Sequence, residues 1–155
     1  MAESRASIAG HPIHPMLVVI PLGLWVTALV FDIVRAVTGN PLWTTLAFWN
    51  IVLGVAGALL AAVPGFLDYP GMAGRIGRIA TWHMALNLGA VVLFAVNAFV
   101  RMRVGPDSGW PLALSVIGVV GVFVSGWLGG EMVYRERYGV QEPGDRRDAR
   151  HRRVA

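Results

Sequence analysis

Four long apolar stretches separated by short polar turns dominate the chain, at about residues 15–34, 42–66, 79–100 and 110–132. Each is close to the roughly 20 residues that a helix needs to cross a hydrocarbon core of about 30 Å. Backbone groups in lipid must be bonded internally, and the stretches lack the strict alternation of a β-barrel. The pattern therefore predicts an all-α four-helix transmembrane bundle with up-down-up-down topology.

Turn-forming residues punctuate the apolar stretches at Gly39-Asn40-Pro41, Asp68-Tyr69-Pro70-Gly71 and Gly105-Pro106-Asp107. The first stretch is longer than the apolar region of a signal peptide and lacks a clear small-residue cleavage site, so we expect it to be retained as a helix. The resulting division is a polar N-terminal segment at 1–10, a membrane domain at 11–140 and a basic, disordered tail at 141–155.

Arginine placement predicts the orientation of the bundle, because four spans put both termini on one side of the membrane. That side carries five arginines before the tail is counted: Arg5, Arg75, Arg78, Arg135 and Arg137. The opposite side carries Arg35, Arg101 and Arg103. The positive-inside rule therefore places both termini in the cytoplasm. The tail arginines have no interleaved aromatic residues, so we expect them to meet anionic lipid and not nucleic acid.

Composition agrees with a membrane protein and excludes several kinds of site. Hydrophobic residues make up 55% of the chain and charged residues 14%, against roughly 25% charged residues in soluble proteins. The chain has no cysteine, which excludes disulfides, thiolate metal sites, iron–sulfur clusters and covalently attached haem. The sequence also lacks the HExxH, P-loop and dinucleotide-binding motifs.

Small residues form a stripe on the second span and another on the fourth. The two sets are Gly54, Gly57, Ala58, Ala61 and Gly65, then Gly118, Gly121, Ser125, Gly126, Gly129 and Gly130. Small side chains let helix backbones approach closely in lipid. The stripes therefore predict tight packing between helices of the bundle. Part of them could instead pack against a second copy of the chain in a homo-oligomer. The two helical hairpins could also be a weak internal duplication.

Candidate chemistry gathers at the cytoplasmic ends of the spans. His11 and His14 stand at the start of the first span, His83 about one turn inside the third, Asp68 at the end of the second and Glu131 at the end of the fourth. Pro15 suits the first position of a helix, and a residue before proline is pushed out of helical dihedrals. We therefore expect the prolines of the His11–Pro15 segment to keep both histidines out of helical dihedrals, to stiffen the segment and to fix where the imidazoles point.

Structural interpretations remain open for these residues. His11 and His14 would cap helix amides at the interface, and His83 would bond to a neighbouring carbonyl or carboxylate. Asp68 would be only a turn residue.

The remaining carboxylates have arginine neighbours on their own helices. Glu131 would pair with Arg135 four residues later, and Asp32 in the first span with Arg35 three residues later. The group at the cytoplasmic ends of the spans converges at one depth: His11, His14, His83, Asp68 and Glu131. This convergence favours a functional interpretation of these residues, because ionisable residues in membranes usually face a bundle interior.

Two kinds of cofactor suit this cluster. Histidines on facing helices can hold haem b axially, with His14 and His83 as ligands, His11 as alternate ligand or neighbour, and Asp68 orienting an imidazole. Met16, Met84, Trp82 and Phe66 are near enough in sequence to line the ring. The alternative is zinc or non-haem iron held by His11, His14 and His83 with Asp68 or Glu131.

Three functions follow from these sites. The first is a redox subunit that passes electrons to or from a quinone or a partner protein. The second is a non-redox scaffold, assembly or transporter-like protein with structural histidines. The third is a membrane metalloenzyme with Asp68 or Glu131 as base, although the chain lacks a nucleophile–base–orienter set for hydrolysis.

Several motifs lie along the chain from about His11 to Val140: HPIHPMLVVIPLGLW, GFLDYPG, GWLGGEMVY, Asp32 and the Trp82-His83 pair. In these motifs the chain resembles the bacterial membrane family DUF2231. The resemblance implies a four-helix protein of the bacterial inner membrane. Some relatives carry a Rieske-type iron–sulfur domain, which implies electron transfer. The family's polar marks fall on His11, His14, Asp32, Asp68 and His83. Relatives often have histidine at the position of Glu131, and a partner would supply any Rieske centre here.

Overall fold

The computed structural model describes residues 4–104 and 108–140. Its four long helices are α2 (Val19–Thr38), α3 (Leu42–Asp68), α4 (Gly74–Arg103) and α5 (Trp110–Gly130). Three short helices extend them: α1 (Ile13–Leu17), the 3₁₀ turn η1 (Tyr69–Gly71) and the π-helical turn η2 (Glu131–Arg135). The tail at 141–155, expected to be disordered, lies outside the described residues.

Four helical segments of the described chain are long and apolar enough to cross a membrane: Ile13–Thr38, Leu42–Gly71, Gly74–Arg103 and Trp110–Arg135. The all-α membrane bundle expected from the sequence is therefore confirmed. The observed helices run a few residues past the expected spans, most of all at the start of α4, where Arg75 and Arg78 extend the helix. Charged residues at helix ends reach beyond the hydrocarbon, so they do not end a helix there.

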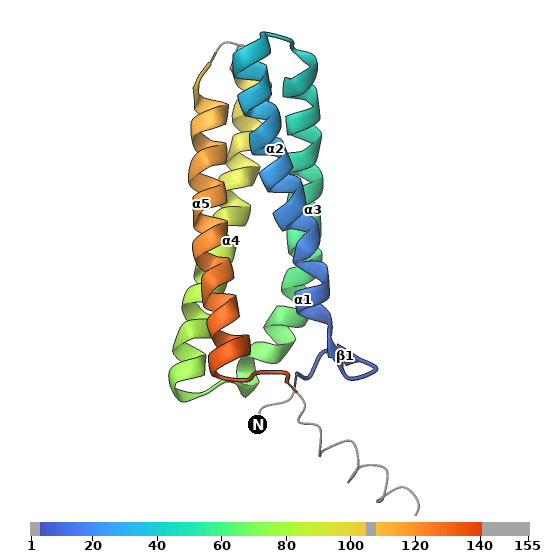
Figure 1. Ribbon diagram of the computed structural model, residues 1–155, viewed down its shortest axis with the longest axis vertical. Coiled ribbons are helices and arrows are strands. Elements are labelled where there is room, and N and C mark those ends of the chain that lie inside the picture. The colour runs from blue at the N-terminus through green and yellow to red at the C-terminus, as the bar shows by residue number, and fades with distance from the viewer. Residues whose placement is uncertain (1–3, 105–107, 141–155) are drawn as a thin grey trace, which may run out of the picture.

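The four long helices form two hairpins that pack side by side. α2 packs mainly on α3, and α4 on α5, while α3–α4 and α2–α5 contacts join the hairpins. α2 and α4 therefore face each other diagonally across the bundle. Figure 1 shows both ends of the described chain at one end of the bundle, together with η1 and the small hairpin of β1 (Ser7–Ile8) and β2 (His11–Pro12). We call this the terminal end.

The apolar core lies away from the terminal end. Its centre is the stacked pair of Trp25 on α2 and Phe94 on α4, whose ring centroids are 4.3 Å apart at an interplanar angle of 14°. The other buried members are Ala28, Ala47, Ile51, Ala90 and Val119. Trp25 and Phe94 each lie about three helical turns farther along their helices than His14 and His83. The histidines therefore lie outside the packed core.

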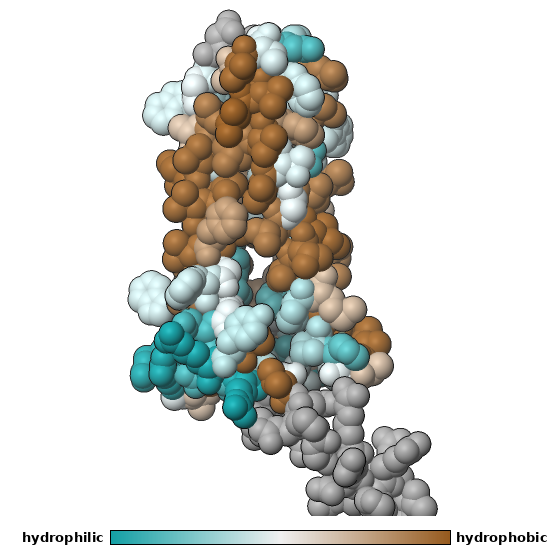
Figure 2. All heavy atoms as spheres, viewed as in Figure 1, coloured by the Kyte–Doolittle hydropathy of each residue, from teal (hydrophilic) through white to brown (hydrophobic). Residues whose placement is uncertain are grey.

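The outer surface matches a lipid environment. Figure 2 shows apolar residues over most of the length of the bundle and polar residues gathered at the terminal end. Large apolar side chains such as Leu60, Val92 and Phe123 are exposed on the outside of three different helices. In water such a surface would be unfavourable, whereas lipid tails solvate it.

The start of the first span differs from the expectation. α1 begins at Ile13, with Pro12 as the residue before the helix, so His14 and Pro15 both lie within its first turn. The prediction that His14 stands outside the helix is wrong. The first four amides of a helix have no acceptor within it, so Pro15 is tolerated anywhere in that turn and not only at its first position. The helix is interrupted at Val18, where Pro21 removes the amide that would bond back to Leu17.

Candidate functional site

Two histidines from diagonal helices face each other at the terminal end. The imidazole of His14 on α1 and that of His83 on α4 have ring centroids 6.1 Å apart, and their planes are nearly perpendicular at 83°. Both side chains are half-buried. The bundle thus brings together two of the three histidines that the sequence singles out.

The His14 ring is fixed by a backbone carbonyl of the neighbouring helix. Its Nδ1 lies 2.7 Å from the carbonyl oxygen of Ala61 on α3. A carbonyl only accepts hydrogen bonds, so Nδ1 donates, and in the neutral ring Nε2 carries the free lone pair. Pro64, within α3, leaves the carbonyl of Leu60 without its helical donor. The acceptor of His14 is the next carbonyl along, that of Ala61.

The His83 ring is fixed in the same way from α5. Its Nδ1 lies 2.8 Å from the carbonyl oxygen and 3.0 Å from the hydroxyl oxygen of Ser125. Nδ1 therefore donates to the carbonyl, and Nε2 is again the unprotonated nitrogen. The Asn87 amide, one turn along α4, donates to His83 Nε2 at 3.0 Å and to the His83 carbonyl at 2.9 Å.

Glycines make room for both imidazoles. A Cβ atom built on Gly65 of α3 would lie 3.0 Å from His14 Nδ1, and one on Gly129 of α5 would lie 3.3 Å from His83 Cε1. Contacts this short are tighter than ordinary packing, so each helix approaches its histidine only because the side chain is absent. These two positions of the small-residue stripes therefore serve the histidine pair.

The two hairpins repeat the same arrangement. His14, Trp25 and Asp32 on α1 and α2 each correspond, 69 positions later, to the residue they meet on α4. The pairs are His14–His83, Trp25–Phe94 and Asp32–Arg101. On α3 and α5 the matching positions are 64 apart: Gly54 and Gly118, Gly57 and Gly121, Ala61 and Ser125, Gly65 and Gly129.

The contacts of these positions also repeat. Gly54 meets Trp25 as Gly118 meets Phe94, in each case where an added Cβ would clash with the ring. Equivalent residues that touch each other across a bundle lie on a twofold axis, here one that runs along the helices, as in membrane proteins built from parallel repeats. His14 and His83 are therefore equivalent residues of two related halves, and they meet at the axis between those halves.

The far end of this axis carries a buried ion pair. Arg101 on α4 donates to both carboxylate oxygens of Asp32 on α2, at 2.8 and 2.6 Å, and Ser115 on α5 donates to the same carboxylate at 2.7 Å. Asn97 accepts from Arg101 Nε at 3.0 Å. The expected pairing of Asp32 with Arg35 on its own helix is replaced by this contact, because Asp32 points into the bundle, where only a charge from a facing helix can reach it.

The other residues proposed as ligands lie elsewhere. His11 is exposed on β2, and its Nδ1 bonds to the Ala9 carbonyl at 3.1 Å. Asp68 is buried, but its carboxylate accepts from the backbone amide of Ala6 at 3.0 Å and from the Ser4 hydroxyl at 2.9 Å. It anchors the N-terminal segment and does not orient an imidazole, whose partners are carbonyls. Within residues 4–104 and 108–140, no three histidine, aspartate or glutamate side chains gather as metal ligands.

Glu131 belongs to an ion-pair cluster near the terminal end. Its carboxylate lies 3.2 Å from Arg135 four residues later and 3.9 Å from Arg75 at the start of α4. The sequence-based pairing of Glu131 with Arg135 is confirmed.

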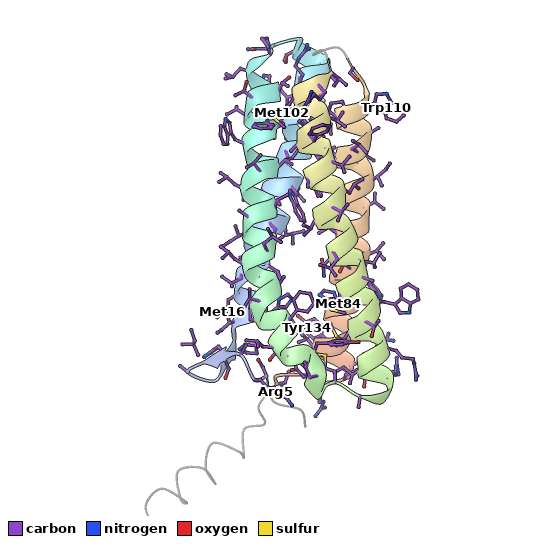
Figure 3. All side chains as sticks on the ribbon, turned by 180° about the vertical axis from the view of Figure 1, so that it is seen from behind. Arg5, Met16, Met84, Met102, Trp110 and Tyr134 are labelled. Carbon is purple, nitrogen blue, oxygen red and sulfur yellow. The ribbon has the colours of Figure 1, made fainter. Side chains whose placement is uncertain are left out.

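The expected lining of a haem ring is only partly present. Met16, Trp82 and Phe66 are exposed on the outside of the bundle, and Met84 is half-buried; Figure 3 shows Met16 and Met84 toward the terminal end. A Cβ on Gly121 of α5 would meet no atom within 4 Å, and Figure 2 shows the surface hollowed between the hairpins in the lower half of the view.

Asn87 and Ser125 are the site residues that the sequence analysis missed. Asn87 lies four residues after His83, a spacing at which side chains of a helix meet, and this signal was available. Ser125 was counted among the small packing residues, and nothing in the sequence pairs it with His83, since the two helices meet only in the fold.

A family model described as "Predicted membrane protein (DUF2231)" matches residues 10–142 of the chain. No curated protein and no solved structure gives a match.

Proposed function

From the premise that the chain belongs to the DUF2231 family of membrane proteins, we propose that it is a redox subunit of the bacterial inner membrane. It holds haem b between His14 and His83 and passes electrons to a quinone or a partner protein. The observation that carries the proposal is the facing pair of imidazoles. Their ring centroids lie 6.1 Å apart, and each Nδ1 donates to a backbone carbonyl.

The geometry of the pair suits two axial ligands of one metal. Imidazoles bound on opposite sides of a metal at about 2 Å per bond have ring centres roughly 6 Å apart. Histidine ligands usually donate their second N–H to a carbonyl or carboxylate, which fixes the tautomer and the ring orientation. The Ala61 and Ser125 carbonyls make these bonds here.

Haem is favoured over zinc or non-haem iron by the number of donors. A zinc site takes three or four protein ligands, and the part of the chain that the structure describes gathers no such set. A haem iron needs only its axial ligands from the protein. The open space at Gly121, one turn before Ser125 on α5, and the hollow that Figure 2 shows between the hairpins support room for a ring.

Each part of the site has a physical role in this proposal. The two imidazoles would hold the iron. The carbonyls of Ala61 and Ser125 keep each Nε2 unprotonated, and Gly65 and Gly129 allow the rings to lie against α3 and α5. Haem b, when bound, supplies one-electron chemistry.

Arginine distribution supports a cytoplasmic terminal end. Arg75, Arg78 and Arg135 lie there. On the opposite side Arg101 is 3% exposed and is bound to Asp32, so it adds no loop charge. Without Arg101, the excess of arginines at the terminal end over the opposite end is larger. This excess supports the positive-inside argument for both termini in the cytoplasm.

A second candidate is a non-redox scaffold, assembly or transporter-like protein. It is favoured by the same hydrogen bonds, because an imidazole bonded to a carbonyl of another helix also joins helices in a membrane without any ligand.

An absorption spectrum of the detergent-purified protein, oxidised and then reduced, tests both candidates. We expect haem bands that are lost in His14→Ala and His83→Ala and retained in His11→Ala, the matched control on the exposed β2 strand. A colourless protein with stoichiometric zinc or iron would favour a plain metal site. A protein with neither haem nor metal would leave the second candidate.

A further inference from the structure

The two halves of the histidine site differ at two positions. Asn87 lies four residues after His83, whereas Val18 lies four residues after His14. Ser125 stands on α5 where Ala61 stands on α3. Polar side chains therefore surround His83 and are absent from the equivalent places around His14, although the backbone contacts of the two rings match.

The Asn87 amide occupies the nitrogen of His83 that would bind a metal. Its Nδ2 donates to the His83 carbonyl at 2.9 Å, which fixes the amide group on the helix, and to Nε2 at 3.0 Å. Nε2 accepts through its lone pair, because Nδ1 already donates to Ser125. A metal needs the same lone pair, so binding of the metal to His83 and the hydrogen bond from Asn87 exclude each other.

Among the residues that the structure describes, no side chain is seen to donate to the other ring in this way. The hydrogen bond of His14 is made by Nδ1, to Ala61, and the valine at position 18 carries no hydrogen-bond donor in its side chain. The lone pair of His14 Nε2 can therefore bind a metal without breaking a bond to its own helix.

We propose that Asn87 is a positioning residue: its hydrogen bond to His83 Nε2 would make His83 the exchangeable ligand of a bound haem and His14 the permanent one. A small neutral ligand such as carbon monoxide would then take the place of His83, whose Nε2 would return to Asn87. This inference rests on the proposed haem site. The incoming ligand is neutral because an isolated charge is costly to bury within a membrane-spanning bundle.

The expected size of the effect follows from the strength of one hydrogen bond. A neutral hydrogen bond shifts an equilibrium in a protein by about two- to tenfold. Removing the Asn87 amide should therefore raise the haem affinity of the protein by about that factor and lower the affinity of the reduced form for carbon monoxide by a similar factor.

The experiment compares the full chain with Asn87→Val, which gives the second half the residue of the first. Haem titration of the detergent-purified protein and carbon monoxide titration of its reduced form are the two measurements. The mirror variant Val18→Asn adds an amide four residues after His14 and should lower haem affinity by about two- to tenfold. It tests the same competition if Asn87→Val does not fold.

A third measurement needs no haem. Nitrogen NMR of the haem-free protein with labelled histidine should show the Nε2 signal of His83 moving in Asn87→Val while that of His14 stays in place. An unmoved His83 signal would mean that the hydrogen bond is absent in solution, and the inference would be wrong.

The outcomes separate the two proposals. If the unaltered chain binds haem through His14 and His83 while Asn87→Val and Val18→Asn change neither affinity, the proposed function stands and the role of Asn87 is overturned. If the unaltered chain takes up no haem, both are overturned.

Discussion

Asp32 and Arg101, 69 positions apart in the sequence, form a two-pronged ion pair with nitrogen–oxygen distances of 2.8 and 2.6 Å, and their side chains are only 6% and 3% exposed. The pair joins the diagonal helices α2 and α4, which also meet through Trp25–Phe94. The contact between His14 and His83 joins α1 to α4. The Asp32–Arg101 pair is the charged end of the same axis whose other end carries the imidazoles.

Asp32→Asn and Arg101→Gln should each destabilise the bundle strongly, since removing one member of a buried pair leaves the other charge uncompensated, at a cost of about 3–5 kcal/mol. The double variant should recover part of this loss. Thermal unfolding in detergent of the four proteins gives the coupling energy, and purely additive losses would contradict the pairing. Haem content of Asp32→Asn should be unchanged, because the pair lies far from the histidines.

Gly118→Ala should loosen the aromatic stack. The added Cβ would lie 2.6 Å from Phe94 Cζ, so the ring must move off Trp25, at a cost of about 1–3 kcal/mol. Gly121→Ala on the same helix is the matched control, because its Cβ would meet no atom within 4 Å and alanine favours a helix by up to about 1 kcal/mol over glycine. Unfolding midpoints and tryptophan fluorescence measure the difference; equal effects would argue against the packing.

Gly65→Ala should lower cofactor content although both histidines remain. Its Cβ would lie 3.0 Å from His14 Nδ1, which pushes the ring from the Ala61 carbonyl and misdirects Nε2. Gly89→Ala, with open space around its Cβ, should retain full content. The measurement is haem per protein after purification, and normal loading of Gly65→Ala would show that ring placement is not critical.

Asp68→Asn should release the N-terminal segment and spare the cofactor. The carboxylate accepts from the Ala6 amide and the Ser4 hydroxyl, and hydrogen bonds to a charged group contribute about 1.5–3 kcal/mol. Amide hydrogen exchange at Ala6 should therefore accelerate about tenfold or more. If Asp68→Asn instead loses haem while the amide exchange of Ala6 is unchanged, Asp68 orients an imidazole as the sequence suggested.

Much of the architecture was predictable because it depends on local properties of the chain. Hydrophobic runs of sufficient length must become helices in lipid, so the four spans and the two hairpins follow from the pattern alone. The pairing of Glu131 with Arg135 also follows, since four positions on a helix place two side chains on one face.

Partners on other helices were harder to predict. For Asp32 the nearest arginine in the sequence, Arg35, was the expected partner, whereas the fold supplies Arg101. For Asp68 the expectation of a ligand-orienting group ignored the N-terminal residues, which return to bond with it. In both cases the competing partner is distant in sequence and close only after packing.

The sequence by itself determined that this chain is a four-helix membrane protein with imidazoles near one end, because hydrophobic length and the cost of polar groups in lipid act on each segment separately. Only the tertiary structure decided which imidazoles meet. Packing of two related hairpins about one axis turns His14 toward His83 and leaves His11 at the surface. The rotation of each helix is set by its contacts with the others, and no single segment encodes it.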